Sequence, residues 1–340
     1  MSKILITGAS GFIGGHIVSA VLDAGHEAVC LVRPGSDRRA LLARGVQLAS
    51  GDMRDAASLS VALQGVDGVI HAAAMLKAPW RRDFEEANVG GTRNLARACA
   101  ARTSPPPLVI VSSLAAAGPA PDETPRTEAW PALPVSLYGR VKRDAERAAA
   151  ALAAELPVTI VRPPMVFGEG DRSALTLFRH AQSGWHLVPG RVDHVASMIH
   201  AADLAALLHA ALLRGERLAP GGGDGPGCYY AAADETPRLS EIGRLIAEAL
   251  DRPPPRVLRT PLSLLWLVAA LGELRGRLSD MPQLMNLDKA RELSSGPWQC
   301  SAQKARRELG FVPLALPLRL RQTARWYREQ GWLPAGRPHP

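Results

Sequence analysis

A tyrosine and a lysine at helical spacing are the first side chains in this sequence that could do chemistry together. Tyr138 and Lys142 are four residues apart in an alanine-rich stretch, residues 136–155, that predicts a helix, so both project from one face. A nearby ammonium lowers the pKa of a phenol from its reference of about 10 toward neutrality, which would make Tyr138 a general acid or base. The same pair is common on ordinary amphipathic helices, so its meaning depends on its surroundings.

A glycine-rich turn near the N-terminus supplies that context. Gly8, Gly11 and Gly14 have the spacing GxxGxxG, directly after an apolar strand and at the start of a helix. Glycines so placed permit a tight turn, close approach of backbone to a pyrophosphate and close packing of helix on strand. The N–H groups at the helix N-terminus then face the phosphates. The turn predicts a dinucleotide site, formed here by Gly8, Ser10, Gly11, Phe12 and Ile13.

Short apolar runs alternate with segments of helical periodicity over the first half of the chain. Strands are expected at residues 3–7, 27–32, 46–49, 68–72, 107–112 and 157–162, and helices at 14–24, 59–64, 88–101 and 136–155. Near-continuous apolar strands separated by helices predict an α/β protein with a doubly wound, parallel Rossmann sheet covered on both faces. The cofactor would then lie across the carboxyl ends of the strands.

The pattern loosens after Pro163, where Pro and Gly clusters at residues 220–227 and 252–255 precede a helical, tryptophan-richer region. We predict that residues 1–165 form the nucleotide-binding domain, to which residues 195–232 return. Residues 166–194 and 233–340 would form a smaller, mostly helical substrate-binding lobe.

Composition excludes several classes of function. The formal net charge is +8, but the 35 arginines and 5 lysines are spread along the chain and aromatic residues make up only 5%, which argues against nucleic-acid binding. Four scattered cysteines lack the spacing of a metal site. The longest strongly apolar stretch, residues 262–271, is shorter than the ~20 residues of a membrane span. Because no signal sequence follows Met1, we expect a cytoplasmic protein.

An ordered series of motifs resembles one known family, the extended short-chain dehydrogenase/reductases of the NAD-dependent epimerase/dehydratase superfamily. The motifs are TGASGFIG (residues 7–14), GDMRD (51–55), HAAA (71–74), NVGGT (88–92), SSLAAAG (112–118), YGRVK (138–142) and RPPMVFG (162–168). The resemblance covers essentially the whole chain. The segments around residues 76–92 and 111–119 look most like the branch of hydroxysteroid dehydrogenases and dihydroflavonol reductases.

The resemblance implies roles for individual residues. Ser113, five residues before Gly118, would hold the substrate oxygen in line with Tyr138, while Ser112 would have a packing role. Lys142 would tune Tyr138 and also hydrogen-bond the nicotinamide ribose. Further cofactor contacts would come from Asp52 and Met53 at the adenine, from the small residues Ala72, Ala73 and Ala74, and from Pro163 and Val166.

The end of the second strand bears on which nicotinamide cofactor is bound. An acidic residue there binds the free ribose 2′-hydroxyl, whereas a 2′-phosphate needs cations. Arg33 occupies this position, with Arg38 and Arg39 shortly after it, and an arginine fork suits a phosphate. Ser10 could add a hydroxyl, but Asp37 could still reach a ribose. We therefore favour NADP(H) and keep NAD(H) as the alternative.

The residues after Ser113 narrow the reaction. Family members that dehydrate nucleotide sugars resemble a Thr-acid-Glu pattern here, whereas this chain has Leu114 and Ala115 and no acid. The leading hypothesis is an NADP(H)-dependent oxidoreductase that interconverts a carbonyl and a secondary alcohol. The alternatives are an NAD-dependent nucleotide-sugar 4-epimerase with the same serine, tyrosine and lysine, and a non-catalytic NAD(P)-sensing regulator. His71 and Asn88 are interpreted as structural residues, Asn88 as a helix cap or a tie between strands.

The substrate side is less defined. Segments 75–84, 115–119, 163–170 and 171–198 combine apolar residues with arginines, which suits either a hydrophobic ketone or the diphosphate of a nucleotide sugar. Residues 261–278 predict an apolar helix, whose Leu262, Leu265, Trp266, Ala269 and Leu274 fit a buried stripe in the substrate lobe. Contact of this helix with a membrane surface is the weaker interpretation. A homodimer is compatible with the sequence.

Overall fold

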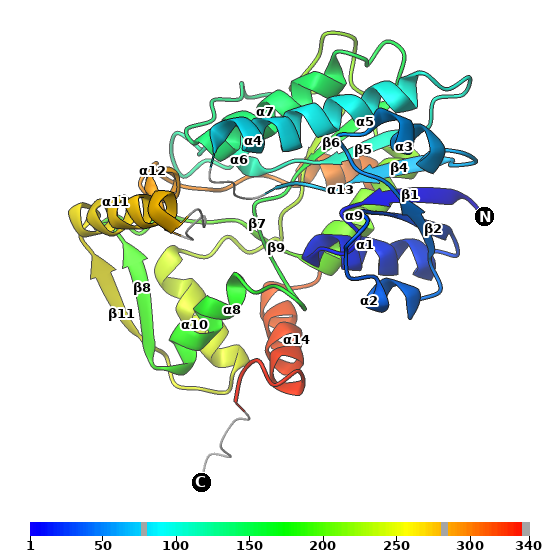
Figure 1. The fold of residues 1–340 in the computed structure, drawn as a ribbon. Coiled ribbons are helices and arrows are strands. Elements are labelled where there is room, and N and C mark those ends of the chain that lie inside the picture. The colour runs from blue at the N-terminus through cyan, green and yellow to red at the C-terminus, as the bar shows by residue number, and fades with distance from the viewer. Residues whose placement is uncertain (76–79, 280–284, 335–340) are drawn as a thin grey trace.

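The fold is described from a computed structural model of the 340-residue chain, which describes residues 1–75, 80–279 and 285–334. Its centre is a seven-stranded sheet with the strand order β10-β6-β5-β4-β1-β2-β3, in which every neighbouring pair is parallel (Figure 1). The strands are β1 (Lys3–Thr7), β2 (Glu27–Val32), β3 (Gln47–Ser50), β4 (Gly68–His71), β5 (Leu108–Val111), β6 (Val158–Arg162) and β10 (Cys228–Tyr230). The order reverses between β1 and β4, and ligands of such sheets bind outside the carboxyl ends of the strands at this point.

Helices cover both faces of the sheet (Figure 1). On one face lie α1 (Phe12–Asp23) and α9 (Ala201–Arg214), with the short α2 (Arg39–Leu42) nearby; on the other lie α3 (Ala56–Ala62), α5 (Gly91–Ala100) and α7 (Leu137–Ala150). Two short helical segments, α4 (Arg81–Glu85) and the π-helix η1 (Glu86–Gly90), lead into α5, and α6 (Leu114–Ala117) follows β5. This confirms the predicted α/β class with a doubly wound Rossmann sheet.

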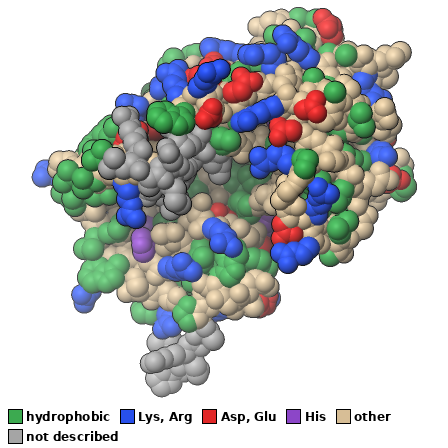
Figure 2. Space-filling view, in the orientation of Figure 1, with side chains coloured by type: hydrophobic (Ala, Val, Ile, Leu, Met, Phe, Trp, Pro, Cys, Tyr) green, Lys and Arg blue, Asp and Glu red, His purple; other side chains and the backbone are tan. Residues whose placement is uncertain are grey.

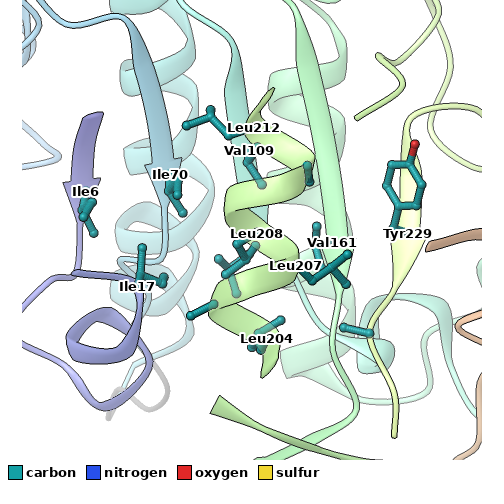
Figure 3. Packing of buried hydrophobic residues seen from close by; sticks show 14 of the residues in the cluster. Ile6, Ile17, Ile70, Val109, Val161, Leu204, Leu207, Leu208, Leu212 and Tyr229 are labelled. Atoms are coloured by element: carbon teal, nitrogen blue, oxygen red, sulfur yellow. The ribbon is translucent and has the colours of Figure 1, made fainter. Parts of the chain in front are cut away.

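The alternation of side chains along β1 shows why two helical layers form. Ile4 and Ile6 belong to the core beneath α1 and α9, whereas Leu5 belongs to the core beneath α3, α5 and α7. Successive strand residues point to opposite faces, so a strand buried on both faces must be apolar throughout. Figure 3 shows the first core, in which Leu204 and Leu208 of α9 lie against the strands.

The remaining elements form a second unit beside the carboxyl ends of the strands. Its core joins α8 (Ala174–Gln182), α10 (Leu239–Ala249) and α14 (Leu316–Glu329). Two short parallel pairs accompany them, β7 (Met165–Phe167) with β9 (Met198–His200), and β8 (Trp185–Pro189) with β11 (Arg256–Thr260). The unit also contains α11 (Leu262–Ser279) and α12 (Leu287–Leu293), whereas α13 (Gln303–Leu309) returns to the central sheet, where Ala305 and Leu309 join the core beneath α9. Of the described helices, none is long and apolar enough to cross a membrane.

The predicted buried stripe on the apolar helix is wrong at two of its five positions. In α11, Leu265 and Ala269 are buried, but Leu262 is 40% and Leu274 is 56% exposed. The reason is that α11 packs against α12 through one narrow face only, so leucines elsewhere around the helix remain at the surface.

Candidate active site

A cavity of about 400 Å³ lies at the carboxyl ends of β1, β2 and β4, the place that the sheet topology predicts for a ligand. Most of the residues assigned to the cofactor line it: Gly8, Ser10, Gly11, Arg33, Asp52, Met53, Ala72, Ala73 and Ala74. Phe12, Ile13, Pro163, Val166, Tyr138 and Lys142 are not in its lining. The residues that line it but were not singled out from the sequence include Thr7, Ser36, Arg54, Met75 and Ala87.

The glycine turn fits a ligand that approaches the backbone closely. Gly8 has φ +72°, and a Cβ there would lie 2.7 Å from the backbone nitrogen of Ala73. At Gly14 a Cβ would lie 2.0 Å from the carbonyl oxygen of Gly8, so only glycine lets α1 begin directly against the turn. The cradle that a dinucleotide diphosphate needs is therefore present in the backbone itself.

Two arginines, Arg33 and Arg54, line this cavity. Within the described part of the chain, the guanidinium groups of Arg33 and Arg54 form neither ion pairs nor hydrogen bonds with protein groups. Asp37 does not line the cavity, because its carboxylate pairs with Arg39 at 2.7 Å in the exposed loop. That pairing lowers the pKa of Asp37 to about 2, chiefly through the hydrogen bond from the Arg39 side chain. The acid that could have favoured a free ribose hydroxyl is thus held by another group.

Tyr138 lies in the first turn of α7, and the start of this helix is built to approach the loop after β5. The side chain of Ser136 caps the helix by accepting a hydrogen bond from the Gly139 nitrogen at 2.9 Å. A Cβ on Gly139 would lie 2.3 Å from the carbonyl oxygen of Ala115, so glycine allows the two segments to touch. The contact places the Tyr138 phenol close enough to the Ser113 hydroxyl for this hydroxyl to affect the pKa of the phenol.

The electrostatics of Tyr138 differ from the prediction. Burial raises the pKa of the phenol to about 12, the nearby Ser113 hydroxyl opposes this rise, and the carboxylate of Glu292 adds to it. Lys142 is not among the groups that shift this pKa in the structure, so its effect on Tyr138 stays a prediction; its ammonium donates to the Val111 carbonyl oxygen at 2.8 Å. Burial lowers the pKa of Lys142 to about 8, and Glu146 opposes this shift. The phenol is therefore neutral and can donate a proton.

Ser112 belongs to a buried network of charges beneath Lys142. Its hydroxyl donates a hydrogen bond to Glu146 at 2.5 Å. Arg162, at the end of β6, donates two hydrogen bonds to the same carboxylate at 2.8 and 2.7 Å. Arg143 adds a contact at 2.9 Å. A buried charge is stable only when it is paired and hydrogen-bonded, so these residues fix α7 to the sheet. Ser113, which is outside this network, remains the serine that can meet a substrate.

His71 and Asn88 have structural partners. The His71 ring lies between the hydroxyls of Thr7 at 2.7 Å and Thr92 at 3.0 Å, and burial lowers its pKa to about 3, so it stays neutral. Asn88 lies inside η1, and its amide bonds both the nitrogen and the carbonyl oxygen of Met75 at 3.0 Å. It therefore ties the loop after β4 to a helix and is not a helix cap.

Pro163 and Val166 lie near the serine side of the site. The carbonyl oxygen of Pro163 accepts a hydrogen bond from the Leu114 nitrogen at 2.8 Å, directly after Ser113, and Val166 lies in β7. The segment that carries Phe84 is near both Tyr138 and the cavity. The ring centre of Phe84 is 6.5 Å from that of Tyr138, and Ala87, three residues later, lines the cavity.

The sequence analysis missed two residues of α12 that hold the start of α7. Asp288 accepts hydrogen bonds from the backbone nitrogens of Leu137 at 2.6 Å and Tyr138 at 3.0 Å. Glu292 accepts from the Ser136 hydroxyl at 2.8 Å. No motif marks them, because they lie about 150 residues downstream in the chain and act only through tertiary contact.

Comparisons with known proteins agree with this geometry. Residues 4–222 match the model of the NAD dependent epimerase/dehydratase family. The chain is 32% identical to the ceramide reductase of Caulobacter vibrioides, over 97% of this chain and 96% of that protein. It is 30% identical to the 2-alkyl-3-oxoalkanoate reductase of Stenotrophomonas maltophilia, over 92% and 94% respectively.

The fold is also similar to solved structures. The crystal structure of a nucleoside-diphosphate-sugar epimerase from Pseudomonas aeruginosa superposes with a TM-score of 0.75 and 26% identity, covering 98% of this chain and 99% of that one. The similarity to these two reductases and to this epimerase thus extends over nearly the whole chain.

Proposed function

The chain belongs to the NAD-dependent epimerase/dehydratase family and is an oxidoreductase enzyme, and from this premise we propose that it is an NADP(H)-dependent reductase of an apolar carbonyl compound. Ser113, Tyr138 and Lys142 are the proposed catalytic residues. The observation that carries the proposal is the neutral, partly buried phenol of Tyr138, which lies near Ser113 beside the cavity that the glycine turn lines.

The residues divide the work of reduction as follows. A bound nicotinamide cofactor supplies the hydride to the carbonyl carbon. Ser113 holds the carbonyl oxygen by hydrogen bonding, and Tyr138 donates its phenolic proton to that oxygen as negative charge develops there. The ammonium of Lys142, on the same face of α7, stabilises the phenolate that remains.

The preference for NADP(H) rests on Arg33 and Arg54. Both guanidinium groups lie at the cavity with no protein carboxylate among the described residues to neutralise them, which is the arrangement a 2′-phosphate requires. Asp52 also lines the cavity, and we assign it to the adenine end as the family resemblance implies.

An apolar substrate suits the residues around the phenol. The Phe84 ring lies 6.5 Å from that of Tyr138 between ring centres, and Leu114 to Ala117 form a small apolar helix directly after Ser113. The two reductases to which the chain is similar carry ceramide and a 2-alkyl-3-oxoalkanoate in their names. We infer that residues 166–194 and 233–340 form the lobe that covers such a substrate.

Oxidation of NADPH and of NADH by the purified protein, followed with a panel of long-chain 3-oxo acids, apolar ketones and UDP-sugars, tests this proposal. We expect turnover of an apolar carbonyl compound with NADPH as the better cofactor. Interconversion of UDP-sugars without net change in the cofactor would favour the epimerase instead. This alternative is tested because the similar Pseudomonas aeruginosa structure is named as a nucleoside-diphosphate-sugar epimerase. Tight NADPH binding without turnover of any compound would favour a sensor.

A further inference from the structure

Exposed apolar side chains are concentrated on one part of the protein. Among the described residues, twenty-one large apolar side chains are well exposed, and ten of them lie on β8, β11 and α11. These ten, which we call the apolar patch, are Trp185, Leu187, Val257, Leu258, Leu262, Leu264, Leu267, Val268, Leu271 and Leu274. The other eleven are spread over the rest of the chain. Monomeric proteins rarely expose such a cluster unless something covers it.

The helix α11 is apolar on two opposite faces. Leu265 and Ala269 are 8% and 0% exposed and pack against Ala290 of α12. On the other face Leu264, Leu267, Val268, Leu271 and Leu274, three or four residues apart, are 46–58% exposed. A surface helix normally presents polar residues there, and a helix that is apolar all round is normally buried on all sides. The outer face of α11 is therefore exposed, although its sequence is typical of a buried helix face.

The two strands before α11 extend the same surface. β8 and β11 pair in parallel, with Trp185 beside Arg256 and Leu187 beside Leu258. Residues in register point to the same side of a sheet, so these four side chains share one face. Trp185 is 42%, Leu187 48% and Leu258 44% exposed. In Figure 2 apolar side chains gather at the left edge of the molecule, where Figure 1 places α11 and the β8/β11 pair.

The surroundings of the apolar patch are basic. Residues 184–193 and 252–279, which carry the patch, contain six arginines and two acidic residues. One of the acids, Asp193, is neutralised by Arg259 at 3.2 Å. Arg256 lies over the Trp185 ring at 5.7 Å, so an aromatic ring and a cation meet at the edge of the patch. Apolar residues bordered by arginine and tryptophan are typical of segments that lie in the interface of an anionic membrane.

We propose that the apolar patch docks on the surface of an anionic lipid bilayer, with the outer face of α11 in the interfacial region. A second copy of the chain fits the surface less well, because a twofold contact through the same patch would bring the arginines of both copies together. The docked surface borders the proposed active site, since α11 packs on α12 and Asp288 of α12 holds the backbone of Tyr138. An apolar substrate could then reach the lobe from the lipid without crossing water.

Cosedimentation with lipid vesicles tests the docking surface without any measurement of activity. The purified protein is mixed with vesicles of phosphatidylcholine alone or with phosphatidylglycerol added. We expect binding to the anionic vesicles, and we expect Leu264→Glu, Leu267→Glu and Leu271→Glu together to weaken it on the order of tenfold or more. The matched control is Val61→Glu, Leu213→Glu and Val312→Glu, three well-exposed apolar residues outside the patch, and it should bind as the wild type does.

A second variant separates charge from apolar contact. Arg191→Gln with Arg256→Gln should weaken binding to anionic vesicles and leave the weak binding to neutral vesicles unchanged. NADPH binding and circular dichroism establish that each variant is folded. The proposal is overturned if the wild type stays in solution with anionic vesicles, or if the α11 variant binds as well as the control. It is also overturned if light scattering shows a dimer that only the α11 variant dissociates, since a second copy then covers the patch.

Discussion

At the scale of single residues, the chemistry depends on which groups are charged. Tyr138 is neutral because burial opposes the phenolate, and the pKa of Lys142 is lowered to about 8 because burial opposes its ammonium. A neutral phenol can donate a proton, and we propose that the protonated lysine stabilises the phenolate that results. His71 is not an alternative donor, because burial keeps its ring neutral far below neutral pH.

The pH dependence of reduction should follow Lys142. The pKa of this lysine is lowered to about 8, so its ammonium is present below that pH and is lost as the pH rises through it. We expect kcat/KM to be level below about pH 8 and to fall about tenfold per pH unit above it. Lys142→Met should lower kcat/KM and abolish its fall above about pH 8. Lys304→Met makes the same change at a lysine paired with Glu216, and in this variant the fall should remain. If kcat/KM of Lys142→Met still falls above about pH 8, Lys142 is not the group whose titration causes the fall.

Cofactor preference belongs to the residue scale as well. Arg33→Asp replaces a cation at the cavity with an anion, so the Kd of NADPH should rise about 100-fold and that of NADH much less. Arg39→Asp makes the same change at an exposed arginine outside the cavity lining and should leave both affinities unchanged. Titration of the two cofactors by fluorescence or calorimetry measures this. Equal losses for NADPH and NADH in Arg33→Asp would contradict the assignment of Arg33 to the 2′-phosphate.

At the scale of elements, the start of α7 is held by a helix from the other end of the chain. The carboxylate of Asp288 bonds two backbone nitrogens at the helix N-terminus, where a negative charge is favourable. These bonds fix the backbone of Tyr138, so Asp288 is a positioning residue. The short helix α12 therefore links the substrate lobe to the catalytic helix.

Asp288→Asn should weaken this link without removing the side chain. We expect kcat to fall about tenfold with little change in the Kd of NADPH, and stability to fall by about 1 kcal/mol, as for the loss of a helix cap. The matched control is Asp55→Asn at the cap of α3, where the amide oxygen can still accept the one hydrogen bond from Ala57, so kcat should stay unchanged. Asp288→Glu should recover part of the activity. Equal kcat in the two Asp→Asn variants would show that Asp288 has no positioning role.

The elements also show where sequence reasoning succeeds. β1, β2 and α7 have strongly patterned sequences between clear breakers, and their positions were predicted to within a few residues. The three-residue strands β7, β9 and β10 were missed, because their pairing depends on partners that are distant in the chain. The stripe on α11 failed because a helix that is apolar all round does not reveal which face is covered.

At the scale of the whole molecule, the sequence was sufficient for the fold and for bringing most of the residues assigned to the cofactor to one cavity. The glycine turn, Asp52 and the small residues after β4 carry local signals, and the structure gathers them around one cavity. The electrostatics of α7 could not be predicted in the same way, because the contacts of Lys142 with Val111 and of Asp288 and Glu292 with the start of α7 join segments that are distant in the chain. The substrate is likewise set by surfaces that distant segments form together.

The transfer of hydride and proton to one carbonyl group is the most direct test of the proposed function. NADPH carrying deuterium on its nicotinamide C4 is incubated with the apolar carbonyl substrate, and the deuterated alcohol is followed by mass spectrometry. The wild type should form it, and Tyr138→Phe should bind NADPH unchanged but form it ~10²–10⁴-fold more slowly, the usual contribution of a general acid. Formation of the deuterated alcohol by Tyr138→Phe at close to the wild-type rate would contradict Tyr138 as the proton donor.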